Sequence, residues 1–358
     1  MTTTDKRAQL ARDVVDTVDD QLMFQYGLTG IGVGLRVVDG KLTDEPCVKF
    51  FVPMKIPKAE LPAHARIPRR LKVGPQTLPG FRQLSEGDEE SAVTDVEEML
   101  PIPCPPWRDP ETERLQSFML ADRSRQRPVS AGNSVSHALG TLGTIAGIVT
   151  DLYDGNRPAI LSCNHVLGQL NYARWGDAIV QPAKNDGGTI AQDLCATLTR
   201  YVPIRFSQTV PNYVDAAIAR LWIPPGKLRG LAPWIGALSG IRSGNAARLG
   251  EEVYKIGRTT GITKGTILAT NVSVWVDYPA ILNGTPGAYA LFKNQIVTTG
   301  LAGFGDSGSL VMDAQKRALG MLFGGTKERT LVNDIELVQK QIGIRLQVRQ
   351  GLEDPKQE

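Results

Sequence analysis

The chain has 358 residues, enough for two domains that each bury a core of their own. The chain has 40 Lys and Arg against 37 Asp and Glu, a formal net charge of +3. This charge is too small to produce a strong electrostatic field, so it does not indicate nucleic acid or an anionic membrane as a partner. Residues 1–20 lack the apolar core of a secretory signal, and no stretch approaches about 18 apolar residues. We therefore expect a cytoplasmic protein that binds neither nucleic acid nor membrane.

The cysteines and histidines are too scattered to predict a metal site or a disulfide framework. No C-x-x-C pair occurs, and only three histidines are present. The four cysteines, which we expect to be free thiols in a reducing compartment, are Cys47, Cys104, Cys163 and Cys195. No metal ion or other cofactor is expected.

The N-terminal third combines helix and strand signals. Apolar residues at helical spacing predict an amphipathic helix over about residues 5–24. Two β-prone runs then flank the turn signal Asp39-Gly40, which predicts a hairpin of residues 31–38 and 47–52. Frequent prolines between 53 and 110 exclude long helices, and a polar connector is expected over residues 108–136. We place a domain boundary near 130, so that residues 1–130 form an α+β accessory domain.

Residues 131–358 are expected to form a second, mainly β domain. From Leu139 onward, many short apolar runs alternate with Gly, Asn and Pro, a pattern typical of an antiparallel sandwich or barrel. The stretch TLVNDIELVQKQIGIRL, residues 330–346, predicts one closing amphipathic helix.

Three short signals in this second domain carry chemistry. His165 follows the end of an apolar strand, Asp215 opens another, and Ser307 lies in a Gly-rich turn that leads into a third. A serine hydroxyl becomes a good nucleophile when a histidine accepts its proton, and a buried aspartate holds the imidazole in one tautomer. Glycines around the serine permit a tight turn in which the amides of Gly305 and Ser307 form an oxyanion hole.

The chain order His, Asp, Ser distinguishes among hydrolases. It is the chymotrypsin order, whereas subtilisin-like and α/β-hydrolase enzymes use others. The pattern G-x-S-x-G of the nucleophile elbow also fails, because Ser309 stands where the last glycine would be. An α/β-hydrolase is therefore disfavoured.

The motifs LSCNHVL, NYVDAAIA, VYKIGRTTGITKGTI and GFGDSGSLV resemble those of trypsin-like (chymotrypsin-fold) serine peptidases, most closely the intracellular bacterial and plant peptidases of the Narrow Leaf type. The resemblance spans about residues 137–348. It implies a chymotrypsin-like double β-barrel in which His165 is the general base, Asp215 its orienting partner and Ser307 the nucleophile.

The resemblance also implies a substrate site. Phe323, Gly324 and Gly325 would pair with the substrate backbone, and Leu301 with Ala302 would form the floor of the specificity pocket. No carboxylate occurs between residues 298 and 305, so an apolar or small residue is expected on the acyl side of the cleaved bond.

Two positions depart from the family pattern, and a third matches it without the expected processing site. Ser309 replaces a common glycine, and Phe323 stands where many relatives carry a serine beside the aspartate. Asp306 resembles the residue that captures a freed N-terminus in secreted zymogens, but no recognisable processing site precedes it. Activation by that route is therefore not expected.

The sequence favours a serine endopeptidase acting on protein or peptide substrates. Two alternatives remain open: a masked or regulatory scaffold protein on a protease fold, and an esterase with the same nucleophile. Assembly into a homo-oligomer also remains open.

Overall fold

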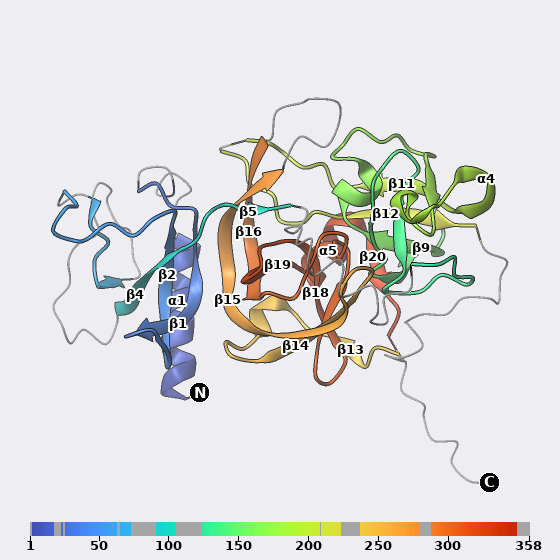
Figure 1. Cartoon of the computed structure of the whole chain (residues 1–358). Coiled ribbons are helices and arrows are strands. Elements are labelled where there is room, and N and C mark those ends of the chain that lie inside the picture. The colour runs from blue at the N-terminus through green and yellow to red at the C-terminus, as the bar shows by residue number, and fades with distance from the viewer. Residues whose placement is uncertain are drawn as a thin grey trace, which may run out of the picture.

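The computed structural model describes residues 2–17, 23, 26–62, 65–72, 91–104, 123–207, 209–222, 237–278 and 288–348. Residues 108–122 of the predicted connector lie outside this set. The described chain is mainly β, with strands gathered into a 12-stranded and an 8-stranded sheet (Figure 1). No helix within these ranges is long and apolar enough to cross a membrane.

The N-terminal hairpin is confirmed. Strand β1 (Gly30–Val38) pairs antiparallel with β2 (Lys41–Val52), and Asp39 and Gly40 both take positive φ in the turn, at 50° and 76°. Positive φ at both central residues matches the twist of a two-residue hairpin. Helix α1 (Thr3–Thr17) packs on both strands through Ala11, Val14 and Val15, at the left of Figure 1. Part of the predicted helix beyond Thr17 lies outside the described residues.

The N-terminal strands extend into the sheet of the second domain. β2 pairs in parallel with β4 (Ser91–Glu98), and β4 pairs with β3 (Arg70–Lys72). β1 pairs antiparallel with the long strand β15 (Gly261–Tyr278), and the short β5 (Ile102–Pro103) pairs with the end of β15 in parallel. The larger sheet is therefore continuous across the domain boundary that we predict near 130.

The two halves of the second domain are the predicted double β-barrel of chymotrypsin-like topology. The smaller sheet runs in the order β20-β8-β9-β12-β11-β10-β6-β7. Its strands are β6 (Ser134–His137), β7 (Gly143–Thr144), β8 (Gly147–Asp151), β9 (Arg157–Ser162), β10 (Ala178–Val180), β11 (Leu194–Tyr201), β12 (Ala217–Leu221) and β20 (Ile344–Leu346). The short helix α4 (Ile190–Asp193) precedes β11.

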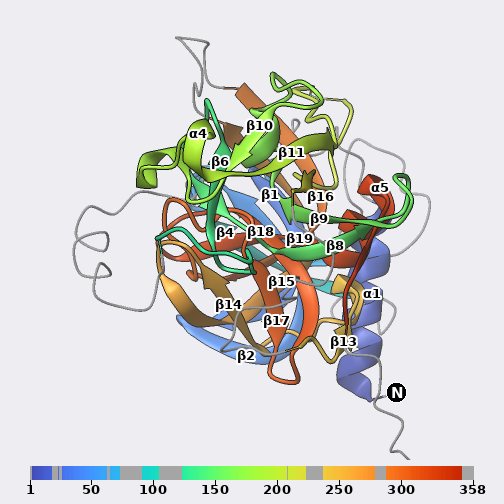
Figure 2. The ribbon, with the colours of Figure 1, turned by 90° about the vertical axis from the view of Figure 1, so that its right-hand side faces the viewer.

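The larger sheet supplies the other half. Besides β15 it contains β13 (Gly240–Ile241), β14 (Glu252–Gly257), β16 (Ala288–Thr299), β17 (Leu310–Asp313), β18 (Arg317–Gly325) and β19 (Arg329–Asp334). Figure 2 shows β14 and β17 below β6, β10 and β11 of the smaller sheet. One apolar core includes Leu161 and Ala217 of the smaller sheet and Val274, Phe292 and Phe323 of the larger.

The predicted closing helix is shorter than the sequence pattern indicated. Helix α5 spans only Ile335–Ile342, with β19 before it and β20 after it. Residues 330–333 are buried and pair with β16 and β18, so tertiary pairing overrides their amphipathic pattern. Asp334 caps the helix by accepting from Glu336 N at 2.7 Å, and Gly343, at φ 70°, ends it.

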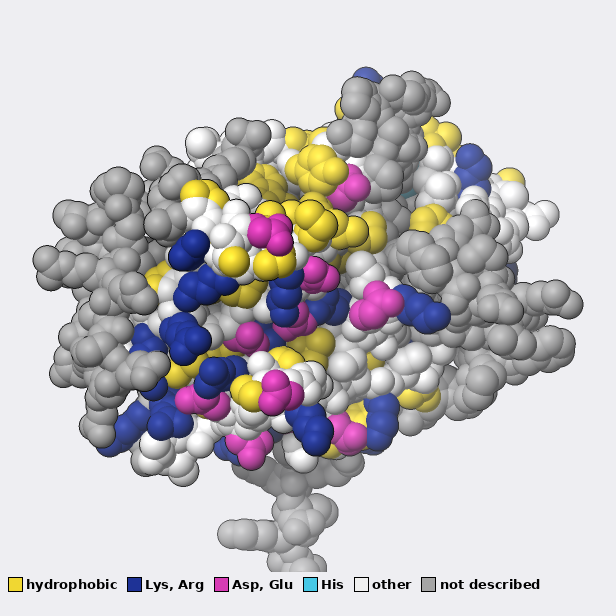
Figure 3. Space-filling view, turned by 60° about the vertical axis from the view of Figure 1, so that its left-hand side comes forward, with side chains coloured by type: hydrophobic (Ala, Val, Ile, Leu, Met, Phe, Trp, Pro, Cys, Tyr) yellow, Lys and Arg dark blue, Asp and Glu magenta, His cyan; other side chains and the backbone are white. Residues whose placement is uncertain are grey.

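The N-terminal side of the molecule carries charges of both signs. Figure 3 shows Lys and Arg side chains mixed with Asp and Glu over this face. Glu45, for example, lies 3.6 Å from Arg7 and 3.0 Å from Arg36. Such exposed pairs contribute little to stability.

β1 lies so close to β15 that there is no room for a side chain at Gly32. A Cβ on Gly32 would lie 2.6 Å from Val272 Cγ2, a rigid and fully buried neighbour. We expect Gly32→Ala to lower the free energy of unfolding by about 1–3 kcal/mol in urea titrations, because the strands must separate.

Gly147→Ala is the matched control. The nearest atom to a Cβ there is 4.0 Å away, and this glycine also lies in a strand. We expect that variant to keep or slightly exceed the wild-type stability. Equal free energies of unfolding for Gly32→Ala and Gly147→Ala would contradict this prediction.

Candidate active site

His165 lies where its motif predicted, directly after an apolar strand. β9 ends at Ser162, and a single π-helical turn, Asn164–Gly168, carries the histidine. The side chain of Asn164 fixes this turn by donating to Val202 O and Asn171 Oδ1, both at 2.8 Å. The turn is buried throughout, so the imidazole has little freedom to move.

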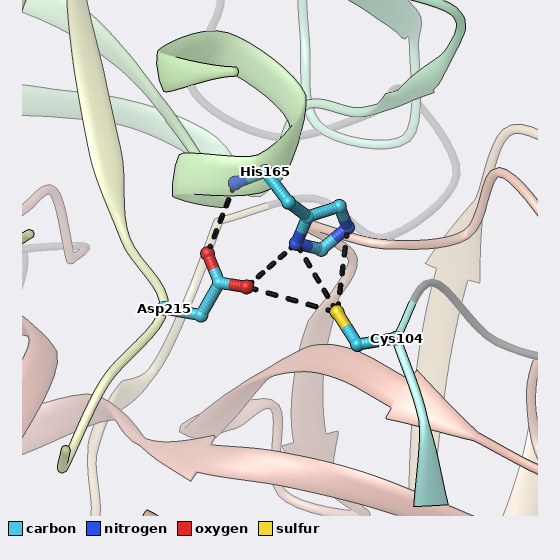
Figure 4. A group of neighbouring side chains, drawn as sticks. All are labelled: Cys104, His165 and Asp215. Carbon is cyan, nitrogen blue, oxygen red and sulfur yellow. Dashed lines mark hydrogen bonds and ion pairs between the residues drawn. The ribbon is translucent and has the colours of Figure 1, made fainter. Parts of the chain in front are cut away.

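Asp215, two residues before β12 begins, holds the imidazole. Its Oδ2 lies 2.6 Å from His165 Nδ1, and its Oδ1 accepts from the backbone N–H of His165 at 3.2 Å (Figure 4). The carboxylate is fully buried, and Asp215 N donates to Asn333 Oδ1 at 2.8 Å. A carboxylate at Nδ1 assigns the proton to that nitrogen and leaves Nε2 as the basic one.

Tyr278 is a third donor to this carboxylate that the sequence analysis missed. Its hydroxyl donates to Asp215 Oδ2 at 3.0 Å, and its ring meets His165 edge-on at 6.4 Å. Burial, followed by the nearby Asp215, raises the pKa of Tyr278 well above its ordinary value, so the phenol keeps its proton. Tyr278 thus supplies a neutral hydroxyl donor to the buried carboxylate.

Ser307 lies in the predicted glycine-rich turn. Gly305 and Gly308 take φ of 102° and 93°, values that favour glycine. A Cβ on Gly308 would also collide with the Thr144 carbonyl and the Ser162 hydroxyl. Thr144 N donates to Ser307 O at 2.8 Å, which fixes the turn against the smaller sheet.

Ser307 lies close to the His165–Asp215 pair but makes no hydrogen bond to it. Ser307 Oγ lies 3.5 Å from the Phe323 carbonyl oxygen, and among the described residues it makes no hydrogen bond to His165. The same carbonyl accepts from Cys104 Sγ at 2.9 Å. Catalytic hydrogen bonds are often long in structures without substrate, so this geometry does not remove Ser307 as a candidate.

The backbone amides of Gly305 and Ser307, which are predicted to form the oxyanion hole, have no hydrogen-bond acceptor in the described part of the chain. Within the described ranges, neither Gly305 N nor Ser307 N donates a hydrogen bond to the chain.

Asp306, beside Ser307, has an internal cation as its partner. Lys255 is fully buried, and its Nζ lies 3.2 Å from Asp306 Oδ2. The other carboxylate oxygen accepts from Thr259 N at 2.8 Å and Thr260 N at 3.2 Å. Burial lowers the pKa of Lys255, and the Asp306 carboxylate opposes that shift. A buried lysine of β14 is therefore the internal cation that pairs with Asp306.

The residues predicted to bind substrate have different environments. Leu301 is 2% exposed and packs in the apolar cluster of the larger sheet, with Ala302 half-buried against it. Phe323 is buried, with its ring centroid 5.0 Å from that of Phe292. Gly324 and Gly325 pair with β19 along one edge of β18. Leu301 is therefore part of the core.

Cys104, His165 and Asp215 form a cluster of potential metal ligands. Their ligand atoms lie within 4.8 Å of one another. Two ligands on one tetrahedral zinc, each about 2.0–2.1 Å from it, lie roughly 3.3 Å apart. The 2.6 Å between Nδ1 and Oδ2 is a hydrogen-bond distance, so this arrangement is that of an imidazole–carboxylate pair.

The thiols near the site are unsuited to act as nucleophiles. All four cysteines are free and buried. Burial, followed by the Asp215 carboxylate, raises the pKa of Cys104 and of Cys163 well above the ordinary value. Because the thiolate is the reactive form, these two thiols are poor nucleophiles.

Comparison with known proteins finds similarity in both parts of the chain. The family described as the NARROW LEAF 1 N-terminal domain matches residues 12–79, outside the region 137–348 that carries the sequence resemblance. No curated protein matches the chain.

Among solved structures, a glutamic acid-specific serine protease described as using a histidine triad in substrate binding is 20% identical, with a TM-score of 0.42, over 61% of this chain and 100% of that one. Protease A of Thermobifida fusca is 18% identical, with a TM-score of 0.40, over 62% and 99%. Cellulomonas bogoriensis chymotrypsin is 20% identical, with a TM-score of 0.39, over 62% and 99%. Identities and TM-scores at this level say nothing of which residues act in this chain.

Proposed function

We propose that this protein is a serine endopeptidase in which Ser307 is the nucleophile, His165 the general base and Asp215 its orienting partner. The observation that carries the proposal is the buried Asp215 carboxylate, 2.6 Å from His165 Nδ1. A buried carboxylate in this position directs the basic Nε2 outward and stabilises the imidazolium that forms when the serine loses its proton.

The reaction follows from these roles. Ser307 Oγ attacks the carbonyl carbon of a peptide bond while His165 Nε2 takes its proton, and the amides of Gly305 and Ser307 bind the developing oxyanion. The imidazolium then protonates the leaving amine, which departs and leaves an acyl-enzyme. Water, deprotonated by His165, hydrolyses the ester and restores Ser307. Every proton in this cycle moves between the chain and its substrate, so no cofactor takes part.

The Lys255–Asp306 pair supports the oxyanion donors. Asp306 lies between Gly305 and Ser307, and its carboxylate also accepts from Gly303 N at 3.0 Å. The pair therefore holds the backbone of the turn on both sides of the oxyanion hole. We propose that this pair keeps the site assembled without proteolytic activation.

The central test uses Ser307→Ala and His165→Ala. Each should lower peptide turnover by on the order of 10⁶-fold and abolish labelling by an alkyl fluorophosphonate, with the label of the wild type mapping to Ser307. The double variant should be hardly worse than either one, because the residues act as a unit. Wild-type turnover in Ser307→Ala would refute the proposal.

His137→Ala is the control for the histidine. His137 is also buried and lies 3.1 Å from a carboxylate, that of Asp177. Among the described residues, neither His137 nor Asp177 makes a hydrogen bond or ion pair with Ser307, His165 or Asp215. The variant should therefore label normally once its folded fraction is matched.

Lys255→Met tests the support of the oxyanion turn. Removing the ammonium leaves Asp306 charged and unpaired, which should lower the free energy of unfolding by about 3–5 kcal/mol. The rate of fluorophosphonate labelling per folded molecule should fall as well. Lys264→Met is the control, since Lys264 pairs with Glu252 at 2.7 Å on the surface. Similar effects of the two substitutions would contradict a special role for Lys255.

Tyr278→Phe tests the third donor to Asp215. The ring and its packing remain, and one hydrogen bond to a buried charge is lost, so kcat should fall roughly tenfold while KM stays unchanged. Tyr289→Phe, at an exposed position of the neighbouring strand β16, should have no effect. A wild-type kcat in Tyr278→Phe would show that the phenol does not assist Asp215.

A further inference from the structure

A short segment of the N-terminal region enters the candidate active site. β5 pairs in parallel with the end of β15, with Ile102 opposite Val276 and Pro103 opposite Asp277. The next residue, Cys104, continues this contact by donating its N–H to Asp277 O at 2.8 Å. The pairing delivers the Cys104 side chain to His165 and Asp215, as Figure 4 shows.

The sulfur of Cys104 contacts the imidazole of His165 and the backbone carbonyl of Phe323 in β18. Sγ lies 3.4 Å from His165 Nδ1 and 3.9 Å from Nε2. Comparable distances to both nitrogens mean that the sulfur covers the ring and is not bonded end-on to one nitrogen. It also donates to the Phe323 carbonyl oxygen at 2.9 Å.

The Phe323 carbonyl is an acceptor that a bound peptide would need. Phe323 lies at an irregularity of the β18–β19 pairing, between the paired residues Leu322 and Gly324. Its carbonyl oxygen is 3.5 Å from Ser307 Oγ, so a peptide whose carbonyl carbon is attacked there has its adjacent N–H close to this oxygen. The Cys104 thiol occupies that acceptor.

The fit of the segment extends to the next residue of β18. A Cβ on Gly324 would lie 3.0 Å from Pro103 O and 3.7 Å from Cys104 Cβ. Because Gly324 has no side chain, residues 103–104 have room to pack against β18. With the segment in this position, Ser307 is fully buried and His165 is 7% exposed.

We infer that residues 102–104 occupy the acyl-side end of the substrate groove, and that a peptide substrate must displace Cys104 from the Phe323 carbonyl before Ser307 can react. This inference rests on the proposed peptidase function and assigns to the N-terminal region a self-inhibitory contact with the catalytic centre. The segment and the substrate compete for one acceptor and for the same face of His165.

The contact is suited to reversible displacement. β5 is only two residues long, and its last contact with β18 is made by a thiol, which is a weak donor. Short edge pairings of this kind belong to the least stable part of a fold. A peptide backbone N–H is a stronger donor than the thiol, so a substrate can replace Cys104 with a net gain in hydrogen bonding.

Cys104→Ala tests the competition directly, since it removes the sulfur and leaves the backbone pairing. A peptidyl diphenyl phosphonate that fills the acyl side should label Ser307 of this variant faster than wild type, by up to about tenfold for the loss of one neutral hydrogen bond. Cys47→Ala, which removes a buried thiol of β2, should label at the wild-type rate. An equal or lower rate in Cys104→Ala would overturn the inference.

A second measurement uses the wild-type protein and so does not depend on a variant folding. Iodoacetamide alkylation of Cys104, mapped by mass spectrometry, should be slow in the free protein, where the thiol is buried. It should become faster when a peptidyl boronic acid is bound, because the displaced thiol reaches solvent. Protection of Cys104 by the boronic acid would instead identify it as a fixed wall of the groove and overturn the inference.

The outcomes separate this inference from the proposed function. If Ser307 labels equally in wild type and Cys104→Ala while the boronic acid protects Cys104, the peptidase function stands and the self-inhibitory contact is wrong. If Ser307 labels in neither protein, both the peptidase function and the inference fail.

Discussion

The candidate site depends on one buried negative charge. The Asp215 carboxylate has no access to water, so the chain itself must supply the hydrogen bonds that solvent would have provided. It does so with the backbone and side chain of His165 and with the Tyr278 hydroxyl. The smaller sheet contributes the histidine and aspartate, and the larger one contributes the tyrosine. The two halves of the second domain must therefore be docked before this charge is satisfied.

A second buried charge, that of Asp306, fixes the other side of the site. Here the compensation comes from within the larger sheet, through Lys255 and the amides of Thr259 and Thr260. The two carboxylates have different partners because they have different tasks. Asp215 faces an imidazole whose charge changes during the reaction, whereas Asp306 faces a cation that only has to hold a loop. A buried ion pair with several added hydrogen bonds suits the second task.

Local sequence patterns predicted the parts of this arrangement that are local in the chain. The hairpin at Asp39-Gly40, the strand before His165 and the glycine turn around Ser307 each depend on a few consecutive residues. The predicted helix over residues 330–346 was too long, because pairing partners distant in sequence made its first part a strand.

The partners of the charged groups could not be predicted in this way. Tyr278 lies 63 residues from Asp215, and Cys104 lies 61 residues from His165, with no spacing rule to connect them. The resemblance had shown only that Phe323 stands where many relatives carry a serine beside the aspartate. It gave no indication that a hydroxyl would come from another strand.

Strand β15 connects the accessory region to the chemistry. Along its length it pairs with β14, then with β1 and β16, and at its end with β5. Its last residue, Tyr278, donates to Asp215, and the segment beside that end carries Cys104 to His165. The N-terminal strand β1 and the two contacts at the site are therefore joined through the backbone pairing of one continuous strand.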